Sequence, residues 1–327
     1  MNAPTIDKFS CKNSNLYTQL TSSPLTEFAD SGVVSRTTPL SSINENKLDD
    51  NHQNNNEDDD DDQSISTEHQ CFSIITKSKL RYKKCDEYKQ YSNCLITYLD
   101  HPSAIFIQLS QDGKHFQQMH QDMNRYYMDN LNGFSNISID ALNSGDFCVA
   151  YSNRYFEFFR ARILNIDPKK NQCLIIYVDF GNSEWIHLKG IRPLHAEFAK
   201  LDIQSIPVTL SHIVPKKDMN TGAIGWDTNV GKSCTRKLRR LVIKPEGEPF
   251  LYVSVTFLSV ERWWPLPFVD IKVDGQDLAE ILHRDGFARL TRNNKDLRMI
   301  YPTFGNHPSE SLIFGLQSTE RLENQYE

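Results

Sequence analysis

The chain has 327 residues and a net charge of −6, with 36 lysine and arginine against 42 aspartate and glutamate side chains. Residues 1–70 carry a net charge of −9, so the remaining chain is mildly basic at +3, far from the charge typical of a duplex-DNA binder. No stretch approaches 18 consecutive apolar residues, so we expect no membrane-spanning helix and no membrane partner.

The first 70 residues are dominated by small polar and acidic side chains. They contain 17 serines and threonines, 9 asparagines and the acidic run Glu57–Asp62. Such a segment cannot bury enough apolar surface to offset its chain entropy. We therefore expect a disordered acidic region over residues 1–89, a folded region over 90–295 and a C-terminal tail over 296–327.

The seven cysteines indicate neither disulfides nor a zinc site. Their number is odd and no two stand at a CxxC spacing, which a disulfide framework or zinc knuckle would require. Cys148 and Cys173 lie in apolar runs, where they act as small core residues. Met1–Leu20 lacks the apolar segment of a secretory signal, so a reducing cytosolic or nuclear compartment fits best.

The folded region is expected to begin with two strands and a helix. Residues 95–99 and 104–109 are rich in β-branched and aromatic residues, and the turn between them contains a proline. Apolar residues then recur at the spacing of one helical face, at Phe116, Met119, Met123 and Tyr126. That face would leave His115 and His120 on the solvent side of the helix.

Short strands with tight turns follow, and their close spacing predicts a small, strongly bent barrel. The four strands are expected at 147–151, 158–165, 173–179 and 184–187. Further strands are expected at 208–213, 250–258, 268–273 and 288–290, with helices over 230–241 and 278–282. The fold class is therefore α+β and mostly β.

Several motifs resemble catalytic signatures but fail on spacing or order. Gly225–Ser233 has five residues between its glycines, whereas a phosphate loop needs four. Asp179–Gly181 and His283–Asp285 match two kinase signatures in the wrong chain order. We find no acid–base constellation, so we expect a non-catalytic protein with no metal and no cofactor.

A basic stretch lies on the predicted helix over 230–241 and just beyond it. Its members are Arg236, Lys237, Arg239, Arg240 and Lys244. We interpret it as a solvated helix face, with weak RNA or phosphate contact as the alternative.

Four segments with the same order and spacing as a known family carry the main functional signal. They are Gly145–Ala150 (GDFCVA), Phe158–Ile163 (FFRARI), Ile176–Glu184 (IYVDFGNSE) and Ile191–Leu194 (IRPL). This stretch resembles a Tudor domain. The flanking strands and helices resemble those of the extended Tudor domain, in which the SH3-like Tudor barrel is inserted into a staphylococcal-nuclease-like, OB-type domain. The resemblance covers about 90–295, with the barrel core at about 140–200.

The resemblance implies an aromatic cage for methylated arginine. Matching positions are Phe159, Tyr177, Phe180 and Asn182. Aromatic faces attract a methylated cation, and an asparagine can accept a hydrogen bond from a remaining N–H. Spacing alone would favour a second interpretation, in which the three rings are ordinary barrel core.

One position departs from the family pattern. The family usually has a further cage aromatic two residues after the alanine of the first strand, where this chain has Ser152. Tyr151 and Tyr155 are the neighbours that could replace it. If neither ring reaches the cluster, the cage is incomplete and methylarginine binding is weak or lost.

The resemblance implies a reader and scaffold in a small-RNA ribonucleoprotein assembly. Expected partners are arginine-methylated proteins of the Argonaute/Piwi type, in piRNA silencing and in cytoplasmic, perinuclear germ granules. Two alternatives remain: an adaptor with a degenerate cage that binds unmethylated partners, and a nuclease-like protein that binds or cleaves RNA. Metal-dependent cleavage would require clustered carboxylates, and we cannot assemble such a set from the flanking strands.

Overall fold

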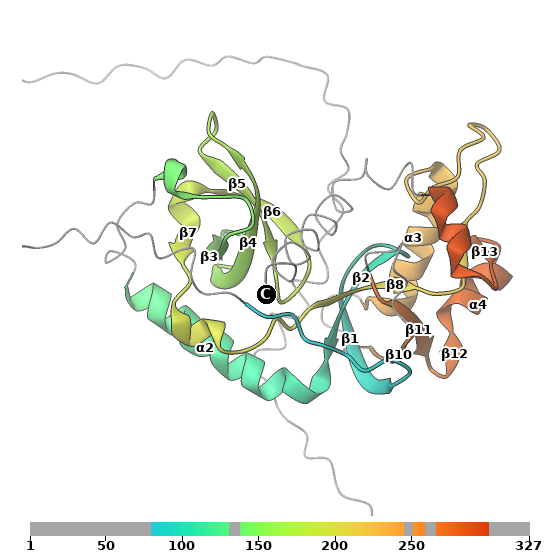
Figure 1. Ribbon diagram of the computed structural model, residues 1–327, viewed down its shortest axis with the longest axis horizontal. Helices are drawn as coiled ribbons and strands as arrows, with labels where there is room; N and C mark the ends of the chain where they lie inside the picture. Colours follow the sequence, from blue (N-terminus) through green and yellow to red (C-terminus); the bar gives the residue numbers. More distant parts are fainter. Residues whose placement is uncertain (1–79, 131–137, 245–250, 259–265, 301–327) are drawn as a thin grey trace, which may run out of the picture. The chain divides into compact units, whose positions relative to one another are not determined.

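The computed structural model describes residues 80–130, 138–244, 251–258 and 266–300 (Figure 1). Most of the predicted disordered region, most of the C-terminal tail and the acidic run lie outside these ranges. The packed chain begins before the predicted boundary at residue 90, because Leu80 is buried in the core and Tyr82 forms a parallel bridge to Ile203. It also continues past residue 295, since a 3-10 segment runs over Asn294–Ile300.

One β unit is assembled from both flanks of the predicted barrel. Its strands follow the order β10-β1-β2-β8-β11-β12, and an additional pairing of β10 with β11 closes the first five into a ring. Among the described strands of this unit, β8 and β11 pair in parallel and the other pairs are antiparallel. The bounds are β1 Gln90–His101, β2 Ala104–Leu109, β8 Ile206–Leu210, β10 Tyr252–Phe257, β11 Phe268–Val273 and β12 Gln276–Asp277.

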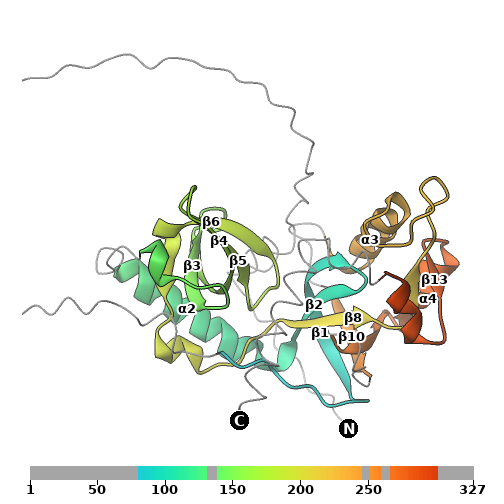
Figure 2. The same ribbon diagram turned by 45° about the horizontal axis from the view of Figure 1, so that its top comes forward.

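The inserted barrel is a five-stranded antiparallel sheet. Its strand order is β6-β5-β4-β3-β7, and helix α2, Gly113–Asp129, runs beside it and contacts β4 (Figures 1 and 2). The bounds are β3 Phe147–Ser152, β4 Glu157–Asp167, β5 Gln172–Tyr177, β6 Ser183–His187 and β7 Ile191–Pro193. All five strands lie between β2 and β8 in the chain, yet β2 and β8 are paired neighbours. The prediction of a barrel inserted into an OB-type unit is therefore confirmed.

The remaining elements cover the first β unit. They are α3 Asn229–Val242, α4 Leu278–Arg284 and a small pair of strands, β9 Ile213–Pro215 with β13 Ala288–Leu290. Thr228 caps α3, because its hydroxyl accepts a hydrogen bond from the Gly231 amide at 3.0 Å. The strand predicted at 208–213 is two strands, since the chain turns at His212, which has a φ of 57°. No helix within the described residues is long and apolar enough to span a membrane.

The buried face of α2 differs from the predicted stripe. It carries Phe116, His120, Met123 and Tyr127. The prediction that His120 faces solvent is therefore wrong, whereas His115 is exposed. His120 is buried because the barrel supplies its partner: Nε2 lies 2.9 Å from a carboxylate oxygen of Glu157. Hydrophobic periodicity cannot reveal such a partner.

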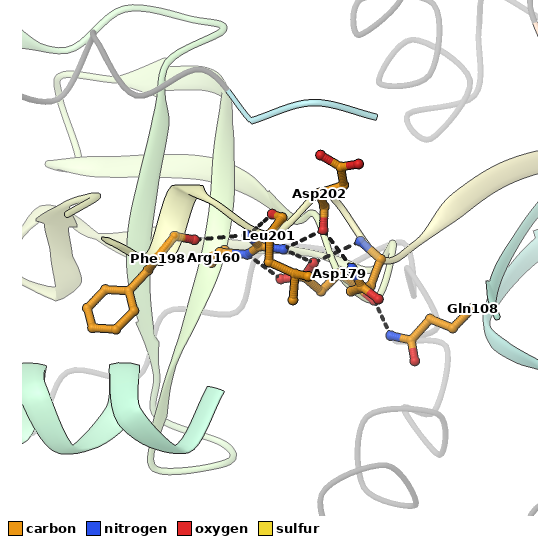
Figure 3. A network of polar contacts seen from close by, with 7 residues as sticks. Gln108, Arg160, Asp179, Phe198, Leu201 and Asp202 are labelled. Carbon is orange, nitrogen blue, oxygen red and sulfur yellow. Dashed lines mark hydrogen bonds and ion pairs between the residues drawn. The ribbon is translucent and has the colours of Figure 1, made fainter. Parts of the chain in front are cut away.

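Arg160 of β4 holds the barrel to the segment that leads into β8 (Figure 3). Its side chain is fully buried, and Nε and Nη2 donate to the two carboxylate oxygens of Asp179 at 2.8 and 2.6 Å. The remaining N–H groups donate to the main-chain carbonyls of Phe198, Leu201 and Asp202 at 3.0, 2.5 and 3.1 Å. All five guanidinium N–H groups are thus satisfied, which is the condition for burying this charge without a large penalty.

The turn that contains Asp179 is held from its other side by the first β unit. Gln108 of β2 donates to the Asp179 carbonyl, and Thr97 of β1 donates to the Phe180 carbonyl at 2.7 Å. Gly181 has a φ of +94°, and a Cβ there would lie 2.2 Å from the ring of Phe106. Only glycine permits both this backbone conformation and this close approach.

We predict that the residues just before β1 contribute measurably to stability. A chain that starts at Cys85 lacks Leu80, the Tyr82 bridge and the Lys83–Asp112 ion pair, whereas a chain that starts at Lys79 keeps them. Burial of one leucine side chain is worth about 1.5–3 kcal/mol, so the shorter chain should melt roughly 3–10 °C lower. Differential scanning calorimetry of the two truncated chains measures this, and equal melting temperatures would contradict the prediction.

We also predict that Arg160→Met destabilises the fold strongly. The substitution leaves the Asp179 carboxylate buried without its cation, which typically costs about 3–5 kcal/mol of unfolding free energy. Arg125→Met is the matched control, because Arg125 pairs with Asp122 on the surface, where such a pair contributes about 0–1 kcal/mol. Chemical denaturation of both variants provides the comparison. A loss for Arg160→Met no larger than that for the control would refute the role of this pair.

Candidate functional site

Three of the predicted site residues form one aromatic cluster inside the barrel. Phe159 lies in β4, Tyr177 ends β5, and Phe180 occupies the turn after it. The ring of Phe159 is 5.1 Å from that of Tyr177 and 5.7 Å from that of Phe180, at interplanar angles of 63° and 86°. These are favourable edge-to-face contacts. Each ring is at most 1% exposed.

Helix α2 adds two rings that the sequence analysis did not include in the site. Phe116 lies 5.7 Å from Phe180, and His120 lies 5.1 Å from Phe159. Asn124, one turn after His120, donates to the Phe158 carbonyl at 3.1 Å and fixes the helix against β4. The only sequence signal for this contribution is the four-residue spacing of Phe116 and His120, which places them on one helix face.

Tyr155 and Tyr151 lie in different places. The Tyr155 ring is 5.9 Å from Phe159 at 78°, and the side chain is 8% exposed. Tyr151 instead packs 5.0 Å from Phe158, against the buried residues that the barrel shares with the first β unit. Alternation along β3 explains this, since Tyr151 and Ser152 point to opposite faces. The structure therefore brings Tyr155 to the aromatic cluster and does not bring Tyr151.

Ser152 is part of a polar group at the same end of the barrel. Its hydroxyl donates to Glu184 at 3.2 Å, and the Tyr177 hydroxyl donates to the same carboxylate oxygen at 2.8 Å. Burial, followed by the Glu184 charge, raises the pKa of the Tyr177 hydroxyl, so Tyr177 remains a donor at neutral pH. At position 152, where the sequence resemblance led us to expect an aromatic ring, a serine hydroxyl thus donates a hydrogen bond to the Glu184 carboxylate.

Asn182 has the least satisfied side chain of the site. Its main-chain carbonyl accepts a hydrogen bond from the Tyr177 amide at 2.9 Å. Its side-chain Oδ1 is buried, however, and accepts no hydrogen bond from any described residue. A buried acceptor that makes no hydrogen bond costs about 1–3 kcal/mol of stability. A ligand that donates a hydrogen bond to this oxygen would remove that cost.

The described residues show no arrangement typical of metal catalysis. Among them, no group of three or more histidine, cysteine, aspartate or glutamate side chains is placed to hold a metal ion. Cys148 and Cys173 are buried as predicted, and burial raises the pKa of both thiols, which disfavours the reactive thiolate.

Comparisons with known proteins agree with this geometry. A family model described as Tudor domain matches residues 86–212. Tudor domain-containing protein 1 of Danio rerio is 25% identical over 164 residues, which is 45% of this chain but only 14% of that protein. The chain therefore corresponds to a small part of this relative.

Solved structures extend the similarity to the whole described fold. One is the human TDRD1 extended Tudor domain, solved in complex with a symmetrically dimethylated peptide. It matches with a TM-score of 0.53 and 18% sequence identity, and the match covers 68% of this chain and 98% of the TDRD1 domain. A variant of the Drosophila melanogaster Papi extended Tudor domain, solved with a Piwi N-terminal peptide, matches with a TM-score of 0.52 and 20% identity over 62% of this chain and 100% of that chain. The same Papi variant has been solved with the dimethylated Piwi peptide. Residues 86–212 thus match the Tudor domain family model, and the described chain has the extended Tudor fold.

Proposed function

We propose that the aromatic cluster and Asn182 bind a methylated arginine side chain of a partner protein, without catalysis. The observation that carries the proposal is the buried Oδ1 of Asn182, which accepts no hydrogen bond from any described residue and lies two residues after Phe180 in the turn that follows β5. Aromatic rings favour a weakly hydrated cation, and the orphan oxygen requires an N–H donor. A methylated guanidinium that keeps an N–H group supplies both.

Electrostatics at the site favour a cation. Glu184 accepts hydrogen bonds from the hydroxyls of Ser152 and Tyr177. Glu157 lies 2.9 Å from Nε2 of His120, whose ring contacts Phe159. Two carboxylates close to a low-dielectric cluster attract a positive guanidinium more strongly than they would in water. Methylation keeps that charge and lowers the hydration that must be removed on entry.

Entry of a ligand requires the turn between β3 and β4 to move. The rings of Phe159, Tyr177 and Phe180 are closed off from solvent, and Tyr155 covers Phe159. The turn is suited to this movement, because Phe156 next to Tyr155 is 71% exposed and has a φ of 56°. After the turn moves outward, Tyr155 forms the wall that the serine at position 152 does not provide.

The complexes of similar domains support the choice of partner. TDRD1 was solved with a dimethylated peptide and Papi with a Piwi peptide, so arginine-containing tails of Piwi-type proteins are the partner class we propose for this chain. The protein would then connect such tails within a cytoplasmic, small-RNA ribonucleoprotein granule. An adaptor that binds unmethylated tails is the alternative that the experiments below separate.

We predict that Asn182→Ala weakens peptide binding without destabilising the free protein. Oδ1 of Asn182 accepts no hydrogen bond from any described residue, so the substitution removes an unsatisfied group from the free protein. In the complex, the ligand N–H loses its acceptor, and affinity should fall about 5–30-fold. Isothermal titration with symmetrically dimethylated and unmodified Arg-Gly peptides measures binding, and thermal melting measures stability.

Tyr252→Ala is the control for this titration, because Tyr252 is an exposed aromatic residue on β10, outside the barrel. Its binding should equal that of the wild type. If the wild type shows no preference for the methylated peptide, the adaptor interpretation replaces the methylarginine site. Unchanged affinity of Asn182→Ala would exclude Asn182 from the site.

We further predict that the two tyrosines near Ser152 respond differently to substitution. Tyr155→Ala removes a ring that contacts Phe159, and the affinity for the dimethylated peptide should fall about 5–30-fold. Tyr151→Ala removes a ring that packs on Phe158, so it should lower the melting temperature and leave affinity unchanged. Titration of both variants at a temperature where both are folded is the measurement. Equal losses of affinity would show that Tyr155 is not a wall of the site.

A further inference from the structure

The exposed face of α3 carries a row of cations that lies outside the methylarginine site. Lys232, Arg236 and Arg240 follow one another at four-residue intervals, and all three are exposed. Residues four apart lie on the same side of a helix, so these three form a line about 12 Å long. Lys244 continues the sequence of exposed cations two residues after the helix ends. We call these four residues the α3 basic row.

The other basic residues of the helix have structural roles and do not belong to the row. Lys237 lies 2.8 Å from Asp285 and 5.8 Å from the centre of the Phe287 ring. Arg239 donates to the Leu99 carbonyl at 2.5 Å and attaches the helix to β1. The basic stretch identified in the sequence therefore divides into two sets. Lys237 and Arg239 bind other parts of the fold, whereas the members of the α3 basic row face solvent.

The α3 basic row is not neutralised within the described part of the chain. None of its four side chains makes an ion pair with a described residue, and Arg236 donates only to the Ser233 hydroxyl at 2.8 Å. The helix itself contains no aspartate or glutamate. Like charges four residues apart destabilise a helix by about 0.2–0.5 kcal/mol per pair, and Lys232 lies near the positive end of the helix dipole. An external anion would remove this repulsion.

The chemistry of the row distinguishes between polyanions. A membrane-binding helix needs a free apolar face, but Cys234, Leu238 and Val242 of α3 are already buried in the protein core. A straight row of lysines and arginines instead matches a chain of regularly repeated phosphates, to which arginine can bind in bidentate fashion. A helix face cannot enter the deep, narrow major groove of duplex RNA, which favours a single strand.

We propose that the α3 basic row binds the phosphate backbone of single-stranded RNA without sequence preference. This site is separate from the aromatic cluster, so one chain could hold a methylated protein tail and an RNA strand at the same time. Binding through three or four phosphates predicts a plot of log affinity against log salt concentration with a slope of about −2 to −3.

The test is fluorescence anisotropy of a labelled oligouridine with the full chain at several salt concentrations. The variant carries Lys232→Gln, Arg236→Gln, Arg240→Gln and Lys244→Gln. The matched control removes the same charge at exposed lysines elsewhere, through Lys169→Gln, Lys189→Gln, Lys272→Gln and Lys295→Gln. We expect the variant to lose at least about tenfold in affinity and most of its salt dependence, whereas the control binds like the wild type.

Several results would overturn the proposal. These are no binding by the wild type, an equal loss in the control, or unchanged binding by the α3 variant. Oligoglutamate and anionic lipid vesicles serve as competitors, and displacement of RNA by either at equal charge concentration would show that the row is not selective for RNA. Retained RNA binding by Asn182→Ala, together with lost peptide binding, would show that the two sites act independently.

Discussion

The buried pair of Arg160 and Asp179 is the interaction on which the remaining architecture depends. Arg160 lies in β4, and its five N–H groups reach a turn of the barrel and three carbonyls of the segment that returns to β8. A buried guanidinium tolerates little displacement, because each lost acceptor leaves a donor unpaired in a medium of low dielectric. The pair therefore fixes the barrel, the turn and the returning chain in one arrangement.

This arrangement explains why the barrel is held by a second β unit. The turn that follows Asp179 carries Phe180 and Asn182, and it is hydrogen bonded on one side to Arg160 and on the other to strands β1 and β2. Two residues proposed to contact the ligand are thus rigid, whereas Tyr155 lies in a turn with exposed neighbours. The site combines a rigid wall with a movable one.

The close packing of the aromatic cluster has an energetic consequence for binding. Rings that touch one another in the free protein must separate in part before a guanidinium enters. In the proposed complex, the free energy of separating these rings is subtracted from the free energy of stacking the guanidinium on them. A single arginine would then bind less tightly than the number of rings suggests. A partner with several methylated arginines would bind more tightly through rebinding, because each raises the effective concentration of the others.

The sequence was sufficient to predict the fold class, the inserted barrel and the aromatic rings inside it. The strand pattern and the spacing of the four Tudor-like segments carry this information directly. It was not sufficient for features that depend on two distant segments. His120 is buried by Glu157, which is 37 residues away in the chain, and Arg160 is satisfied by carbonyls about 40 residues further on. Contacts of this kind also decide why α2 buries His120 and Tyr127 in place of Met119 and Tyr126, and which of Tyr151 and Tyr155 joins the aromatic cluster. Within α3, the sequence showed basic residues, but only the partners of Lys237 and Arg239 separate these structural cations from those without an ion pair to a described residue.

The pairing of β2 with β8 bears on how the chain folds. Ile105 and Val208 are partners across this pair, although the whole barrel lies between them in the sequence. Closing so long a loop from an unfolded chain is entropically costly and slow. The first and last barrel strands are themselves paired, however, with Cys148 opposite Pro193. A barrel that forms first therefore brings its two ends together and shortens the loop that remains to be closed to residues 110–146 and 194–205. The position of the insertion thus favours formation of the barrel before the OB-type unit.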